Sequence, residues 1–392
     1  AAMRREMGFA TLLGFNLSLD LKDTSRYAVS FGAFSPMMDK DFYANPDPGK
    51  TEAYLDYLTK LLELGGESEA AARADAQRVY DMEKVVSAAS LDVQDTGNVD
   101  LIYNLYTMEE LKALFPQGDL EVFFAATGLK EEETIQVSDV GAMEAAVGYF
   151  TQEHLEDLKA MSKLGLILMV SDTLSQEFQD ADYEFTKAYY GVEGRQTIEQ
   201  IAAGQVQSML SDYLSRAYAE AYFTPEAKAD VEEMIHEFIA IYKERLETQD
   251  WMSEETRAMA LKKLDTMQVK VGYPDSWETY LDKAEIKEPE EGGSFFSNLI
   301  SIQKAQWEEV LSWQGQGVDK TMWIMSPYTV NACYSPAFND ITFPAAILQA
   351  PMYDVEASRE ENLGSIGYII AHEITHAFDN NGAKFDERGN AA

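Results

Sequence analysis

A helical repeat of apolar residues runs through the long central part of this chain and limits the folds open to it. From Thr51 to about Lys270, hydrophobic side chains recur at intervals of three and four residues, the spacing that gives a helix one buried face. The two clearest stripes are Tyr54, Leu55, Tyr57, Leu58, Leu61 and Leu62, and Val231, Met234, Ile235, Phe238, Ile241 and Tyr242. The sequence therefore predicts a mainly α protein with a large helical lobe.

Composition supports a folded protein and excludes one class of partner. The chain has 392 residues, of which 46% are hydrophobic and 25% charged, enough for two domains with real cores. Its formal net charge of -37 would repel nucleic acid over most of the surface. No apolar run is long enough to cross a membrane, and the single cysteine, Cys333, cannot form an internal disulfide. We expect no nucleic-acid partner and no membrane span in this chain.

The helical pattern is bounded by segments of different character. Near the start, Leu17–Asp20 and Tyr27–Phe31 alternate in polarity around a polar turn, which predicts a β-hairpin. Val271–Asp275 contains a glycine and a proline that break the helical pattern, and we place a domain boundary there. We thus expect a helical lobe at 1–268 and part of a second domain at 269–392.

The second domain contains two further β-like runs and one helix with a distinctive pattern. The runs Tyr328–Tyr334 and Ile341–Phe343 are separated by a turn. A later apolar stripe predicts a helix that is stopped by an Asn-Asn-Gly sequence. The members of that stripe are Leu363, Ile366, Ile370, Ile374 and Phe378.

This helix carries two histidines and a glutamate in the pattern His372-Glu373-Ile374-Thr375-His376. Histidines four residues apart lie on one helical face, one turn apart, and can occupy two corners of a tetrahedral zinc site. Glu373 then lies beside the metal, where it can take a proton from a zinc-bound water. The alternative is a surface or core helix that contains these residues by chance. The pattern favours one Zn²⁺ and a hydrolytic reaction.

Several segments around this pattern resemble the neprilysin family of zinc metallopeptidases. The zinc-site block is Glu361–Gly364, Ile370–Asp379 and Gly382–Asn390, and two further blocks are Val330–Pro336 with Ile341–Gln349, and Val271–Asp275. The resemblance implies a large helical lobe facing a thermolysin-like α+β zinc-peptidase lobe, of which this chain holds the first part. It also implies a zinc endopeptidase that cuts oligopeptides on the amino side of hydrophobic residues.

The resemblance assigns roles to three more residues. Asn331 and Ala332 match the positions whose side-chain amide and main-chain carbonyl hold the substrate backbone, a mode that suits an exposed strand edge. Asn331 could instead be a turn asparagine that bonds its own backbone. Asp379 could accept a hydrogen bond from a ligand imidazole, or could be a solvated residue at the helix end.

The sequence contains no match for the third zinc ligand that the resemblance implies. In the family the third zinc ligand is a glutamate on a later helix, and the groups that polarise the scissile carbonyl lie further downstream. The nearby carboxylates at positions 356, 360, 361 and 387 are too close to the zinc helix, or precede it, and we nominate none of them. We therefore expect a C-terminally truncated chain whose partner is the missing C-terminal segment of the same protein.

Two other functions stay open at this point. The first is a non-catalytic peptide-binding homologue, although such a protein would not need Glu373. The second is a helical structural protein with a chance motif, which would bind no zinc. The lack of paired cysteines favours a bacterial source, with a location in the cell envelope or outside the cell, or alternatively in the cytoplasm.

Overall fold

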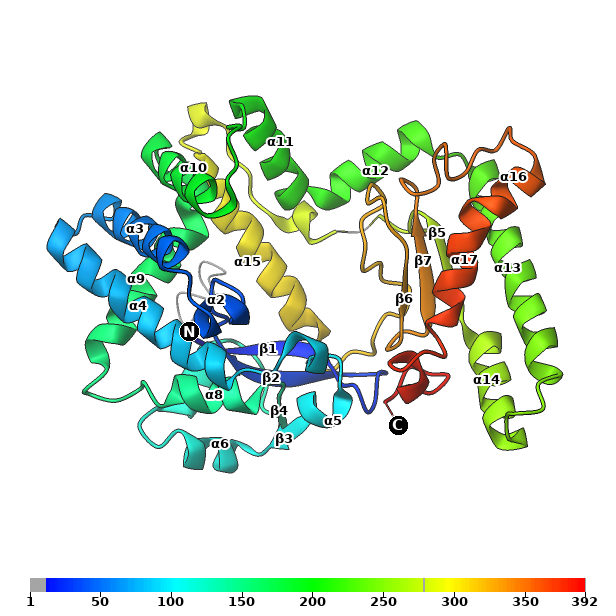
Figure 1. Ribbon diagram of the computed structural model, residues 1–392, viewed down its shortest axis with the longest axis horizontal. Helices are drawn as coiled ribbons and strands as arrows, with labels where there is room; N and C mark the ends of the chain where they lie inside the picture. Colours follow the sequence, from blue (N-terminus) through cyan, green and yellow to red (C-terminus); the bar gives the residue numbers. More distant parts are fainter. Residues whose placement is uncertain (1–11, 278, 392) are drawn as a thin grey trace. The chain divides into compact units, whose positions relative to one another are not determined.

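The computed structural model describes residues 12–277 and 279–391 (Figure 1). The described chain forms two compact units. The first consists of residues 12–18, 28–200 and 280–314, and the second of 19–27, 201–277, 279 and 315–391. The boundary expected after residue 268 falls inside the second unit, within a strand. No helix in the described ranges is both long and apolar enough to cross a membrane.

The first unit is built mainly of helices, as the apolar repeat predicted. Its helices are α2 (Lys40–Ala44), α3 (Pro48–Leu64), α4 (Glu69–Ala89), α5 (Val99–Ile102), α6 (Met108–Leu114), α7 (Leu120–Ala125), α8 (Val140–Val147), α9 (Leu155–Val170), α10 (Gln176–Tyr190) and α15 (Phe295–Trp313). Helix α11 (Ile198–Met209) begins in this unit and ends in the second. All six residues of the first predicted stripe are buried on α3.

A four-stranded sheet completes the first unit. Its strands are β1 (Leu13–Leu19), β2 (Tyr27–Ala33), β3 (Asn104–Tyr106) and β4 (Ile135–Val137), in the order β1-β2-β4-β3. Neighbouring β1 and β2 confirm the predicted hairpin, and its tip, residues 19–27, belongs to the second unit. Strand β4 is parallel to β2 and antiparallel to β3.

The second unit packs helices against a three-stranded sheet. Its helices are α12 (Ser211–Tyr222), α13 (Pro225–Glu247), α14 (Glu254–Thr266), α16 (Arg359–Gly364) and α17 (Ile366–Thr375). Its strands are β5 (Gln268–Gly272), β6 (Cys333–Ser335) and β7 (Asp340–Pro344), in the order β5-β7-β6, with β5 parallel and β6 antiparallel to β7. Strand β6 is thus at an edge of the described sheet.

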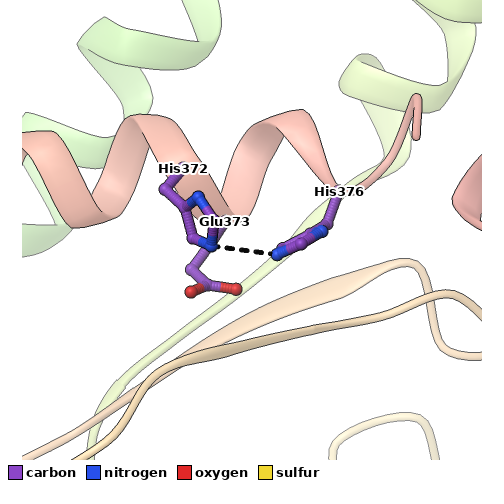
Figure 2. Close-up of side chains that lie close together, drawn as sticks. All are labelled: His372, Glu373 and His376. Atoms are coloured by element: carbon purple, nitrogen blue, oxygen red, sulfur yellow. Dashed lines mark hydrogen bonds between the residues drawn. The ribbon is translucent and has the colours of Figure 1, made fainter.

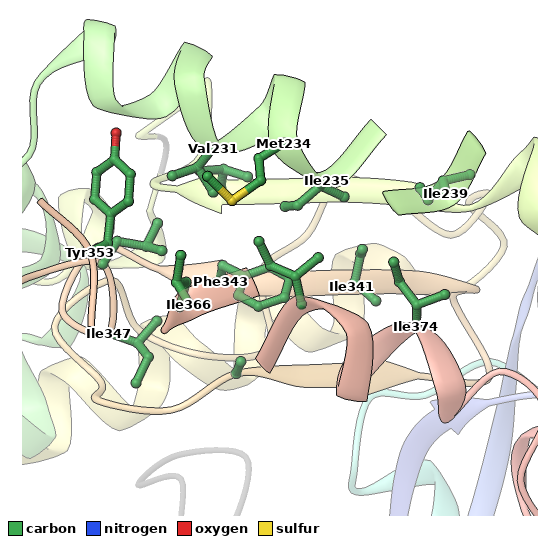
Figure 3. Close-up of a cluster of buried hydrophobic side chains, with 14 of the residues drawn as sticks. Val231, Met234, Ile235, Ile239, Ile341, Phe343, Ile347, Tyr353, Ile366 and Ile374 are labelled. Atoms are coloured by element: carbon green, nitrogen blue, oxygen red, sulfur yellow. The ribbon is translucent and has the colours of Figure 1, made fainter. Parts of the chain in front are cut away.

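One apolar core joins these elements, and Figure 3 shows its centre. Val231, Met234 and Ile235 on α13 face the strand residues Ile341 and Phe343, and all five are fully buried. The next group, Ile366, Ile370 and Ile374, lines one face of α17 and is also fully buried. This core places α17 in a fixed orientation beside the sheet.

Three local predictions were wrong. The run Tyr328–Tyr334 contains a strand only from Cys333, because the preceding residues form turns and open chain. The predicted zinc helix is interrupted at Ser365, where the backbone leaves the helical region between α16 and α17. Leu363 and Ile241 are exposed, at 37% and 47%, and on α13 the buried position is Ile239.

A buried carboxylate ties α3 to α4 in the first unit. Glu83 on α4 is 4% exposed and accepts hydrogen bonds from the hydroxyls of Tyr54, at 2.7 Å, and Tyr43, at 3.1 Å. The backbone N–H of Met37 donates a third bond at 3.1 Å. Burial raises the pKa of Glu83, and these three donors oppose that rise. A buried acid is tolerated here because its oxygens have partners.

We predict that Tyr54→Phe lowers the free energy of unfolding by about 1 to 3 kcal/mol, because Glu83 would keep its burial and lose a donor. Tyr57→Phe, on the same helix, is the control. Its hydroxyl lies 3.4 Å from the exposed Asp182, so its removal should cost less than about 1 kcal/mol. Urea unfolding followed by circular dichroism measures both. Equal losses would contradict the role given to Glu83.

Candidate metal centre

The two histidines of the motif lie on the face of α17 that points away from the core. At about 100° per residue, positions 372 and 376 fall almost opposite the buried isoleucines. His372 is exposed and His376 is half-buried. The hydroxyl of Tyr242 on α13 donates to the carbonyl of Ala371 at 3.0 Å and holds this part of the helix.

The ring nitrogens of the two histidines converge. The Nε2 atoms of His372 and His376 are 3.1 Å apart, as the dashed line in Figure 2 marks. Two nitrogens bound to one tetrahedral zinc at about 2.0 to 2.1 Å would lie about 3.3 Å apart. The observed separation fits two ligands of a single metal ion.

The carboxylate of Glu373 lies beside the two imidazoles. One potential ligand atom from each of His372, Glu373 and His376 lies within 4.8 Å of the others. Glu373 is 5% exposed. Burial raises the pKa of its carboxyl group, while the two histidines and the backbone N–H of Tyr334 act to lower it. A carboxyl group with a raised pKa is better suited to exchange protons near neutral pH than a solvated one.

Asp379 is hydrogen-bonded to one of the histidines. Its Oδ2 lies 2.7 Å from Nδ1 of His376. Its Oδ1 accepts backbone N–H bonds from Asn381, at 2.8 Å, and Gly382, at 2.7 Å. Burial acts to raise the pKa of Asp379, but these bonds outweigh it and lower the pKa. The carboxylate is thus held ionised, and it directs Nε2 of His376 away from itself.

Asn331 and Ala332 lie immediately before the edge strand β6. Asn331 is exposed, and Ala332 is 8% exposed in the core of the second unit. Strand β6 contacts α17, the helix that carries the histidines. Cys333 in β6 is half-buried, and burial raises the pKa of its thiol to about 11, so this cysteine is not a reactive thiolate at neutral pH.

The four carboxylates that were not nominated as zinc ligands lie apart from the two histidines or have other partners. Glu361 caps α16 by bonding Ser358, and Glu387 pairs with Lys262. Glu356 and Glu360 are exposed. Within the described ranges, His372, Glu373 and His376 form the one group of metal-binding side chains that converges.

Sequence reasoning missed two residues near this group. The backbone N–H of Tyr334 faces the Glu373 carboxylate, and nothing in the sequence pattern reveals a main-chain donor. Lys263 on α14 is 4% exposed and bonds the loop that follows α17. A signal for it did exist, because Lys263 lies between the apolar positions Ala260, Leu264 and Met267 of a helical stripe.

Comparisons with known proteins identify the family of the chain. The two models of Peptidase family M13 match residues 1–274 and 331–392. A neutral endopeptidase of Lactobacillus helveticus is 32% identical over 96% of this chain, and human endothelin-converting enzyme 1 is 31% identical over 90%. The chain spans 58% of the length of the first relative and 47% of the second.

Solved structures share the fold over 100% of this chain. PEPO from Lactobacillus rhamnosis HN001 has a TM-score of 0.89 at 24% identity, and the chain covers 62% of it. The zinc metalloprotease ZMP1 of Mycobacterium tuberculosis, in complex with an inhibitor, has a TM-score of 0.87 at 27% identity, with 59% covered. Since the family models match most of its length, the chain belongs to peptidase family M13, as its resemblance to the neprilysin family predicted.

Proposed function

We propose that this protein is a zinc-dependent endopeptidase that hydrolyses oligopeptides, with Glu373 as the general base. The observation that carries the proposal is the convergence of the two Nε2 atoms at 3.1 Å with the Glu373 carboxylate beside them. Membership in peptidase family M13 supports it. The preference for cleavage on the amino side of hydrophobic residues is proposed from the family resemblance alone.

The residues present fit a zinc ion that has further ligands. His372 and His376 would hold it through Nε2, and Asp379 would orient the second imidazole. A bound Zn²⁺ lowers the pKa of a coordinated water to about 7 and polarises a carbonyl group. Glu373 is then placed to accept a proton from the attacking water and to pass it to the leaving amine. A binding protein without chemistry would have no use for this carboxylate.

The substrate backbone would be held at the edge strand. Asn331 is exposed just before β6, so its side-chain amide can donate to and accept from an extended peptide. The backbone groups at this edge can pair with such a peptide by strand addition. We propose Asn331 and the carbonyl of Ala332 as the contacts that align the scissile bond.

We propose that the third zinc ligand belongs to a segment beyond residue 392. Two imidazoles supply half of a tetrahedral shell, and sites that hold zinc firmly use at least three protein ligands. The relatives extend well beyond the length that this chain spans. The groups that stabilise the developing oxyanion would come from the same segment.

The first test removes the base. In the full-length protein, Glu373→Gln should retain zinc and peptide binding, while kcat falls by at least about a thousandfold because both proton transfers are lost. Glu360→Gln, an exposed carboxylate on α16, is the matched control and should keep normal turnover. A fluorogenic peptide assay with metal analysis measures both effects. Turnover of Glu373→Gln within tenfold of the wild type would exclude the proposed role.

The second test concerns the substrate strand. Asn331→Ala should lower kcat/KM by the equivalent of about 1 to 3 kcal/mol, because a substrate amide would lose its partner. Zinc content should not change, since this side chain is not a ligand. Loss of zinc from the variant would show that Asn331 supports the fold of the site, and the strand-addition proposal would then be wrong.

The third test concerns ligand number. Residues 1–392 expressed alone should bind zinc much more weakly than the full-length protein and should hydrolyse peptides negligibly, because two protein ligands do not complete the shell. Adding the proposed C-terminal segment, covalently or as a separate chain, should restore both properties. Zinc titration is the measurement. Tight, stoichiometric zinc with peptide cleavage by residues 1–392 would place the third ligand inside them.

A further inference from the structure

Lys263 is a buried cation behind the metal centre. It lies on α14, and its Nζ donates to the carbonyl of Gly382 at 2.6 Å and to that of Phe385 at 2.9 Å. Lysine is rarely buried to 4% exposure, because its charge loses hydration. Burial lowers the pKa of Lys263 to about 8, against the attraction of Asp386 and Asp379. The loss of hydration at Lys263 must therefore be offset by the contacts that its ammonium group makes.

The two carbonyls belong to the first residue of the short helix η5 (Gly382–Lys384) and to the residue that follows it, and residues 376–381 connect η5 to the zinc helix α17. Gly382 is packed so closely against the end of that helix that a Cβ added to it would lie 1.9 Å from the carbonyl oxygen of His376. The carbonyl of Gly382 therefore faces Lys263 with little freedom to move.

Gly382 also connects Lys263 to a metal ligand. Its N–H donates to Oδ1 of Asp379 at 2.7 Å, and Oδ2 of Asp379 lies 2.7 Å from Nδ1 of His376. Hydrogen bonds thus connect the Lys263 ammonium to the Gly382 carbonyl and the Gly382 N–H to Asp379 and the imidazole, and the covalent backbone of Gly382 joins the two parts. The next anchors of this loop lie further along, where Thr266 and Asn339 donate to the carbonyl of Glu387 at 3.0 and 3.2 Å.

We propose that Lys263 is a positioning residue for the zinc ligand His376. By fixing η5, it keeps the Gly382 N–H directed at Asp379, and Asp379 then holds the imidazole with Nε2 toward the metal. This inference rests on the proposed zinc function. Removal of a residue that hydrogen-bonds directly to a metal ligand, as Asp379 does, commonly lowers metal affinity by 10- to 100-fold.

The experiment measures zinc affinity of the full-length protein by competition with a chelator. Lys263→Met, which keeps the length of the side chain and removes its donors, should weaken zinc binding by about tenfold. Lys262→Met is the matched control. Lys262 is the next residue of the same helix and pairs with the Glu387 side chain at the surface, so its loss should leave zinc affinity unchanged. Unchanged affinity of Lys263→Met would overturn the proposal.

A double-mutant cycle with Asp379→Ala separates positioning from general support of the fold. If Lys263 acts through Asp379, Lys263→Met should weaken zinc binding little further once Asp379 is removed. Additive losses would assign Lys263 a merely structural role and overturn the proposal. Should Lys263→Met not fold, Lys263→Gln retains one donor group and enters the same cycle.

The wild-type protein tests the underlying function independently. Zinc binding that is lost in His372→Ala shows that the metal centre exists, whatever the Lys263 variants do. Absence of such binding from the full-length wild-type protein would instead reject the proposed function itself.

Discussion

Burial of the isoleucine face of α17 is the constraint on which the metal centre depends. Ile366, Ile370 and Ile374 are all fully buried against α13 and the sheet, so the helix cannot rotate without exposing them. Each fully buried side chain of this size contributes about 1.5 to 3 kcal/mol. A rotation that moved the histidines would lose the burial free energy of several of these side chains at once. The apolar core therefore determines where the imidazoles point.

Polar contacts then refine an orientation that packing has already set. Asp379 selects the direction of one imidazole, and the Tyr334 N–H meets the carboxylate of Glu373 from the neighbouring strand. Asp379 follows His376 by three residues, whereas Tyr334 lies on a strand far from the helix in sequence. The site thus combines a motif of five residues with one local carboxylate and with a main-chain donor that the tertiary fold brings near it.

Sequence reasoning succeeded where a pattern is local. The stripe on α3 matches its buried residues, and the predicted hairpin is formed by β1 and β2. It failed where tertiary contacts determine the ends of an element. The break at Ser365 and the shortness of β6 follow from packing and pairing, which periodicity does not record. Lys263 and Glu83 are buried and have hydrogen-bond partners far along the chain, which no local sequence pattern reveals.

The length of β6 also limits how strongly a peptide could be held by the proposed strand addition. Strand β6 has three residues, so it offers few main-chain groups to another strand. Such a short edge is a poor template for sheet extension by a second copy of the chain. Under the proposed strand addition, a peptide that paired with β6 would gain little affinity from its backbone alone, and most of its binding free energy would have to arise at the proposed metal centre and from its side chains.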